Sequence, residues 1–159
     1  MIDPDVLKIE TDLVVTALHQ RGIHVLACAP AFAPAVAEMS LLMALALARR
    51  VVEHDAAFRD GEEKYSAASN PGCFLLHNRT VGLLGCGNVG QALLPLLRPF
   101  GGQILVHDPW LHDNVLRDLQ IEPVDLTTLL RRSEVLFLLA AVTTENQHLI
   151  GARELELLG

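Results

Sequence analysis

Residues 85–90 read Gly-Cys-Gly-Asn-Val-Gly and match the spacing G-x-G-x-x-G. In this spacing the first glycine permits a tight turn, the second lets a phosphate approach the backbone, and the third lets the following helix pack on the preceding strand. The helix that opens here offers unpaired N–H groups and its positive dipole end to an anion. The motif therefore predicts a diphosphate-binding turn with these contact residues: Gly85, Gly87, Asn88, Val89 and Gly90.

An acidic residue stands where a dinucleotide site needs one. Asp108 lies 18 residues after Gly90, close to the spacing of ~20 expected for a carboxylate on the ribose hydroxyls. Such a carboxylate accepts hydrogen bonds from both hydroxyls of NAD and repels the 2′-phosphate of NADP. The nearest basic residues, Arg79 and Arg98, both precede Asp108. NAD is the predicted cofactor, and the alternative is a glycine turn with an incidental aspartate beyond it.

The elements that must position these residues alternate regularly in the second half of the chain. Strands are expected over 80–84, 103–107, 122–124 and 135–139, and helices from the end of the glycine turn 85–90 to about 98 and over 113–119, 126–132 and 152–158. Asp125 is expected to cap the helix that begins at Leu126. Strands that alternate with helices predict an α/β fold with a parallel sheet and right-handed crossovers. The wholly apolar 135–139 is expected to be buried on both faces.

The strand order predicts where a ligand binds. In a doubly wound sheet the ligand lies where the strand order reverses. We expect strand 80–84 to lie between 103–107 and 135–139, so that a crevice opens between the ends of 80–84 and 135–139. Residues 140–143 then form the opposite wall, and Ala141 and Thr143 join the candidate cofactor contacts. The alternative is an ordinary turn at the end of a strand.

The first half of the chain is mostly helical. We expect a helix over 13–21, capped by Asp12 and stopped by Gly22, and then a short β-prone run over 23–27. A single long helix is expected from Pro34 to about Arg59, with an apolar first half that needs cover on every side and a charged second half. The polar loop 61–72 is the candidate linker.

Composition excludes several classes of protein. Twelve Lys and Arg against 19 Asp and Glu give a net charge of −7, which argues against nucleic acid and against a polybasic membrane patch. The three cysteines are scattered and no metal-ligand spacing occurs, so we expect free thiols and no metal site. The N-terminus has neither the basic nor the apolar region of a leader, and in the most membrane-like stretch, 29–48, the continuous apolar run covers only 41–48. These features predict a cytoplasmic chain outside the membrane.

Several motifs in one order resemble the NAD-dependent D-isomer-specific 2-hydroxyacid dehydrogenases. They are Gly22–Val25, Val36–Glu38 with the leucine-rich run to Arg50, Thr80–Gly90, Phe100–Gly101, His107–Pro109 and Val142–Ile150. The resemblance implies a partial doubly wound (Rossmann) parallel sheet with a long N-terminal interdomain helix. It divides the chain into a remnant of the substrate domain at 1–29, an interdomain helix and linker at 30–78, and the N-terminal part of the NAD-binding domain at 79–159.

The resemblance also implies an activity, the transfer of hydride between NAD and a D-2-hydroxy acid or 2-oxo acid. The family's catalytic Arg, Glu and His all follow the last helix expected here, so no catalytic residue is assigned and this chain alone is expected to be inactive. The family usually has Pro where Ala141 stands. Two alternatives stay open, a non-catalytic dinucleotide-binding module and a degenerate fragment that binds no nucleotide.

Association follows from exposed apolar surface. Without a further strand, 135–139 has an open apolar edge, and the apolar helix after Pro34 lacks part of its cover. We expect a homodimer that binds a small-molecule cofactor and substrate.

Overall fold

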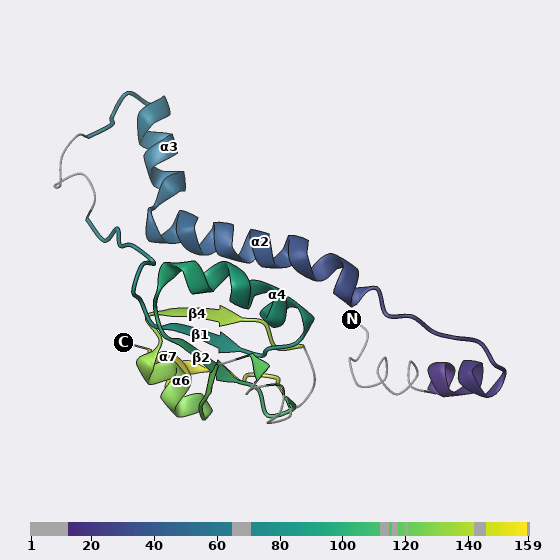
Figure 1. The fold of residues 1–159 in the computed structure, drawn as a ribbon. Coiled ribbons are helices and arrows are strands. Elements are labelled where there is room, and N and C mark those ends of the chain that lie inside the picture. Colours follow the sequence, from purple (N-terminus) through teal and green to yellow (C-terminus); the bar gives the residue numbers. More distant parts are fainter. Residues whose placement is uncertain are drawn as a thin grey trace.

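Four parallel strands form one sheet in the computed structural model (Figure 1). Strand β1 (Val81–Leu84) lies between β2 (Ile104–His107) and β4 (Val135–Leu138), and β3 (Glu122–Pro123) extends the sheet beyond β2. The predicted α/β class and strand order are confirmed. The residues that the structure describes are 13–64, 71–111, 115, 118, 119, 121–141 and 146–158.

The two faces of the sheet carry separate apolar cores. Helix α4 (Asn88–Leu97), extended by the short 3₁₀ helix η2 (Arg98–Phe100), covers one face, and α6 (Leu126–Arg132) covers the other (Figure 1). Because side chains alternate along a strand, Leu83 packs in the α4 core while its neighbour Leu84 packs in the α6 core with Leu129. A short last helix, α7 (Ala152–Leu155), ends well before the predicted residue 158.

The predicted cap of α6 is confirmed. One carboxylate oxygen of Asp125 accepts a hydrogen bond from the Thr128 N–H at 2.9 Å, and the other accepts from the Thr128 hydroxyl at 2.6 Å. These bonds stabilise the charged carboxylate and lower the pKa of Asp125. They fix the start of α6, the helix that packs on the second face of the sheet.

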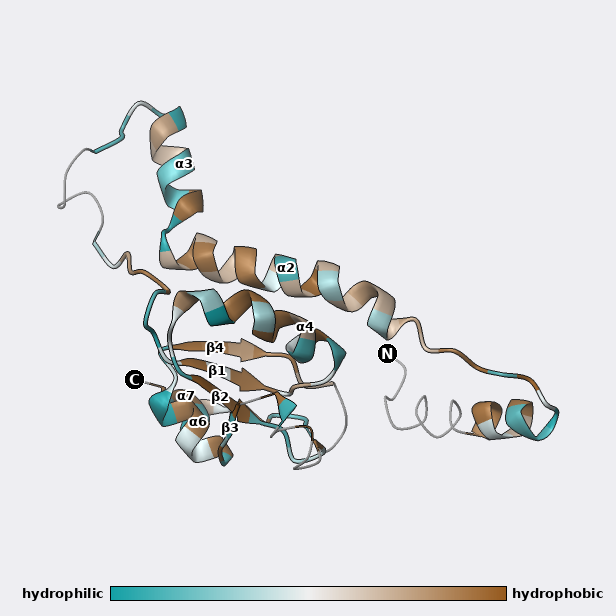
Figure 2. Ribbon diagram, in the orientation of Figure 1, coloured by the Kyte–Doolittle hydropathy of each residue, from teal (hydrophilic) through white to brown (hydrophobic). Residues whose placement is uncertain are grey.

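Helix α2 (Ala29–Ala48) packs along α4 on the side away from the sheet (Figure 1). Its contact side carries the buried Ala33, Ala37 and Ala48, whose small side chains let the two helices approach closely. The apolar half is not covered on every side, because Phe32 and Leu42 are among several exposed apolar side chains. This agrees with the expectation that the helix lacks part of its cover. Figure 2 shows how much of this helix is apolar. By length and composition, α2 alone among the helices in the described part of the chain could cross a membrane.

The single long helix expected up to Arg59 is wrong, because α2 ends at Ala48 and α3 (Val51–Arg59) begins after a break. Arg50 adopts a left-handed conformation with φ 49° and ψ 45°. The Ala48 carbonyl, which a continuous helix would pair within itself, accepts the N–H of Phe74 at 2.9 Å. The Arg50 guanidinium donates to the Pro71 carbonyl at 3.0 Å. The chain that returns after the linker therefore ends α2.

The start of α2 also differs from the prediction. The helix begins at Ala29 instead of Pro34, because Pro30 occupies the first turn, where a missing N–H loses no helical bond. Pro34 then lies inside the helix, where a proline removes one backbone bond.

The segment before α2 was predicted with mixed success. Residues 13–20 are helical, and Gly22 stops this helix with φ 72°. The Ile23 N–H donates to the Leu18 carbonyl at 3.0 Å and the Gly22 N–H donates to the His19 carbonyl at 2.9 Å, which completes a Schellman motif. The strand expected over 23–27 is wrong, since these residues are exposed and belong to no strand. Asp12 lies outside the described residues.

Strand β4 is the edge of the described sheet, so the expectation of burial on both faces is wrong. Of its four residues only Phe137 is buried, and Leu138 is 59% exposed. Most of the helix expected over 113–119 and much of the linker lie outside the described residues, although residues 115 and 118 are helical.

Candidate functional site

A cleft of about 530 Å³ opens at the carboxyl ends of β1, β2 and β4. The strand order reverses here, because β2 lies on one side of β1 and β4 on the other. Ligands bind at such a point in open parallel sheets. Its volume falls within the range of small-molecule sites. The lining residues that determine what the cleft can bind are Gly85, Gly87, Asp108, Trp110, Ala141 and Asn146.

Gly85 makes the turn that ends β1. Its φ is +92°, a value that residues with a Cβ rarely adopt, and a Cβ at this position would lie 2.7 Å from the backbone nitrogen of Ala140. Its N–H donates to the His107 carbonyl at 2.9 Å. The absence of a side chain therefore brings the ends of β1, β2 and β4 together around the cleft.

Gly87 and Gly90 serve different purposes in the helix that follows. Gly87 is the N-cap of α4, it is exposed, and a Cβ there would meet nothing within 4 Å. Space is therefore open directly above the backbone where Asn88 and Val89 start the helix, and their N–H groups precede any helical acceptor. Gly90 is buried, and a Cβ there would lie 3.1 Å from the Gly85 carbonyl oxygen. The expected roles of open approach and close helix packing fit this geometry.

Asp108 lies at the end of β2 and joins it to the glycine turn. One carboxylate oxygen accepts the Cys86 N–H at 2.7 Å, and the other accepts the Trp110 N–H at 3.0 Å. The side chain is half-buried at the wall of the cleft. Two carboxylate oxygens offer about four acceptor positions, so Asp108 keeps acceptor capacity for hydroxyl groups while its orientation is fixed.

Cys86 is fully buried beside that carboxylate. Burial, and then the negative charge of Asp108, raise the pKa of the thiol to about 11. The thiol is therefore neutral near pH 7 and is not a nucleophile there. Gln91 donates to the Cys86 carbonyl at 3.1 Å, which ties the turn to the first turn of α4.

The opposite wall follows β4, as predicted. Ala140 and Ala141 line the cleft, and the Asn146 side chain donates to the Ala141 carbonyl at 2.8 Å. The predicted contact Thr143 lies outside the described residues. All the other predicted cofactor contacts line the cleft.

Sequence reasoning missed several lining residues. Trp110 follows Asp108 by two residues, so its place in the same turn was a usable signal. Ala29 begins α2 and reaches the cleft only through the packing of α2 on α4, for which no local pattern exists. Asn146 and Leu149 also line it.

Two histidines, His107 and His148, lie in segments that line the cleft. The Nδ1 of His107 lies 2.9 Å from the Val124 carbonyl, to which a protonated nitrogen donates. His148 is exposed and has a φ of 59°. Within the described ranges, no group of three His, Cys, Asp or Glu side chains could hold a metal ion.

Comparison with known proteins identifies the family. The family model of the D-isomer specific 2-hydroxyacid dehydrogenase NAD binding domain matches residues 41–159. The chain belongs to this family. Its cofactor is NAD, and its sheet is that of the family's Rossmann domain.

Relatives agree with this family assignment. Glyoxylate reductase of Thermococcus litoralis is 36% identical over 143 residues, which are 87% of this chain and 43% of that protein. D-lactate dehydrogenase of Escherichia coli is 37% identical over 128 residues, which are 80% of this chain and 38% of that protein. A phosphoglycerate oxidoreductase from Rhizobium etli superposes with a TM-score of 0.79 at 35% identity, covering 90% of this chain and 42% of its own. The chain therefore spans less than half the length of these relatives.

Proposed function

We propose that the cleft between the ends of β1, β2 and β4 holds NAD. The observation that carries the proposal is the open space above Gly87 at the N-terminus of α4, next to a fixed carboxylate at Asp108. The N–H groups of the turn would hold the diphosphate, and the free acceptor positions of Asp108 would hold the adenosine ribose. Ala141 would line the adenine side, and Thr143 stays a proposed contact.

We also propose the activity of the whole protein, oxidation of a D-2-hydroxy acid or reduction of a 2-oxo acid. When bound, NAD supplies the hydride acceptor or donor for this reaction. Relatives named glyoxylate reductase, D-lactate dehydrogenase and hydroxypyruvate reductase support this class of substrate. We assign no catalytic residue in this chain; its residues bind and orient the cofactor. The alternative is a binding module without turnover.

Calorimetric titration with NAD tests the binding proposal. We expect saturable binding by the chain and loss of binding in Gly87→Val, whose side chain would fill the diphosphate space. We expect the same loss in Asp108→Ala, which removes the ribose acceptor. Phe58→Ala on α3 is a matched control, because Phe58 is exposed and does not line the cleft. An unchanged isotherm in both cleft variants would show that NAD does not bind at this site.

A turnover assay separates the candidate activities. The chain is mixed with NADH and a panel of 2-oxo acids, and oxidation of NADH is followed. We expect binding without turnover, because the described cleft contributes cofactor contacts alone. Clear turnover that Gly87→Val abolishes would refute the assignment of no catalytic residue.

The division into domains stays a proposal. We propose a substrate-domain remnant at 1–29, an interdomain helix and linker at 30–78, and the cofactor domain at 79–159. The exposed segment 23–28 supports the first boundary, and the start of β1 at Val81 supports the second. Limited proteolysis, which cleaves exposed backbone first, should cut within 23–28 and 61–64 and leave 79–159 intact.

We further propose a cytoplasmic homodimer joined through α2. Besides Leu42, its exposed large apolar side chains recur every three or four residues and so share one side of the helix, away from the buried alanines. They are Phe32, Val36, Met39, Met43 and Leu47. We name this set the α2 stripe. A second copy covers the stripe better than lipid does, because Glu38 is exposed on the same helix and its other side is already packed on α4.

Light scattering in detergent-free buffer tests this association. We expect a dimer for the chain and a monomer for the double variant Met39→Glu, Met43→Glu. Leu138→Asn changes the exposed end of β4 instead, and we expect it to leave the dimer intact. A monodisperse monomer of the unchanged chain, or a need for detergent to keep it in solution, would contradict the proposal.

A further inference from the structure

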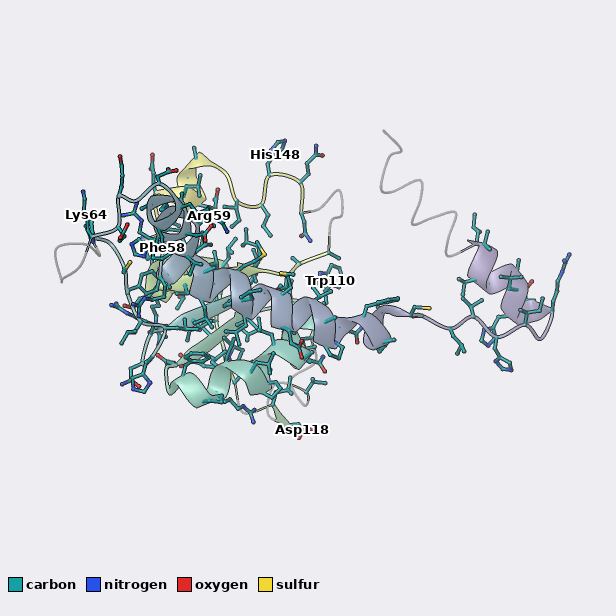
Figure 3. All side chains as sticks on the ribbon, turned by 90° about the horizontal axis from the view of Figure 1, so that it is seen from above. Phe58, Arg59, Lys64, Trp110, Asp118 and His148 are labelled. Carbon is teal, nitrogen blue, oxygen red and sulfur yellow. The ribbon has the colours of Figure 1, made fainter. Side chains whose placement is uncertain are left out.

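Trp110 is the only tryptophan of the chain, yet its side chain is 74% exposed. A large aromatic ring left in water has apolar area that a partner or ligand can cover. Trp110 also lines the cleft, and Figure 3 shows it far from the other labelled exposed aromatic residue, Phe58 of α3. The exposed indole therefore lies at the candidate cofactor site.

The backbone of Trp110 is fixed to the carboxylate beside it. Its N–H donates to one Asp108 oxygen at 3.0 Å, and the N–H of Leu111 donates to the Asp108 carbonyl at 3.3 Å. These two bonds form a turn that carries the indole next to the group proposed to hold the ribose. The base attached to that ribose must lie within reach of the same turn.

The wall that faces this turn has no aromatic side chain among its described lining residues, which include Leu139 and Leu149. Ala140 and Ala141 line it, and Asn146 holds the Ala141 carbonyl at 2.8 Å. Aliphatic side chains leave room for a flat ring but offer it no aromatic face to stack on. A base in this half of the cleft must therefore obtain most of its stacking from the other side, where the indole is the large aromatic surface.

We propose that Trp110 stacks on the adenine ring of the cofactor and determines the affinity of this subsite. The inference rests on the proposed function, because it requires NAD in the same cleft. Stacking of a base on an aromatic side chain makes binding about five- to a hundredfold tighter than alanine does at the same position. Trp110→Ala should therefore raise the Kd for NAD by about five- to a hundredfold. Trp110→Phe should keep most of the affinity, because its ring can still stack.

The experiment is a calorimetric titration of the chain and three variants with NAD. Trp110→Ala, Trp110→Phe and the control Phe58→Ala are compared, and thermal melting confirms that each is folded. In parallel, the emission of Trp110 is followed while AMP or NAD is added, because a sole tryptophan reports contact at its own ring. We expect the emission to change as the site saturates.

The outcomes distinguish this inference from the proposed function. Equal Kd values for the chain and Trp110→Ala, with binding still lost in Gly87→Val, would refute adenine stacking while the cofactor site stands. Equal weakening in Trp110→Ala and Trp110→Phe, or an emission that stays constant through saturation, would also refute it. If the unchanged chain binds no NAD, the proposed function itself fails and this inference fails with it.

Discussion

Asp108 has a structural role that is separable from its role in binding, and Asp108→Ala tests it in the absence of cofactor. The carboxylate accepts the N–H of the buried Cys86 at 2.7 Å and the N–H of the exposed Trp110 at 3.0 Å. In Asp108→Ala the Trp110 N–H can bind water, but the Cys86 N–H loses its partner within a buried turn. An unsatisfied buried donor costs about 1–3 kcal/mol, at the upper end where the lost acceptor is charged.

We therefore expect Asp108→Ala to lower the free energy of unfolding by about 2–3 kcal/mol. For a chain of this size, that corresponds to a fall of roughly 4–12 °C in Tm. Asp108→Asn keeps one acceptor oxygen, so its loss should be about half as large. Thermal unfolding followed by circular dichroism measures both, with Asp118→Ala as the control because that carboxylate is exposed outside the cleft. A Tm of Asp108→Ala equal to that of the unchanged chain would refute the bridging role.

Three further predictions follow from the geometry of single residues. Gly85→Ala should lower the free energy of unfolding by about 2–4 kcal/mol, because of its φ of +92° and the 2.7 Å backbone overlap. Gly87→Ala should lower the free energy of unfolding by no more than about 1 kcal/mol. Equal losses for Gly85→Ala and Gly87→Ala, measured by chemical denaturation, would contradict this difference. Glu134 accepts the Thr80 N–H and pairs with Arg79, and both interactions lower its pKa. The stability it contributes is present above its unfolded pKa and is lost as pH falls through the lower folded value, so acid unfolding curves of Glu134→Gln should be flatter there. With the other two cysteines changed to serine, alkylation of Cys86 should show a pKa of about 11, and Asp108→Asn should lower it, because the charge is removed while burial remains; a pKa unchanged by Asp108→Asn would contradict the electrostatic contribution.

The parts of the fold that sequence predicted well are those that local chemistry decides. The glycine turn at 85–90 needs a positive φ and close packing, which the residue types state directly. Asp125 caps α6 through bonds to a residue only three positions later. The strand order followed from the doubly wound arrangement that alternating strands and helices indicate. The cleft and most of its predicted contacts could therefore be located from the sequence alone.

The errors share a different cause, since each depends on a segment distant in sequence. The apolar run 23–27 has strand-forming residues but no neighbouring strand to pair with in the described chain. Strand β4 is apolar enough for burial on both faces, yet its outer edge is open and Leu138 is exposed. A pattern of side chains states what an element can bury. It does not state whether a neighbour is there to cover it.

The break between α2 and α3 shows the same limit in a single hydrogen bond. The residues from 45 to 55 suit a helix throughout, so local propensity favours continuity, and a left-handed Arg50 costs on the order of 1–3 kcal/mol. Continuity loses because the Ala48 carbonyl accepts the Phe74 N–H, and the Arg50 guanidinium binds the Pro71 carbonyl. Both partners lie more than 20 residues downstream, Pro71 at the end of the linker and Phe74 just after it. Arg50→Gly and Arg50→Ala both lose the bond to Pro71, but only glycine relieves the strained backbone. Chemical denaturation should therefore show Arg50→Gly to be the more stable of the two variants, and equal stabilities would contradict the strain at this position.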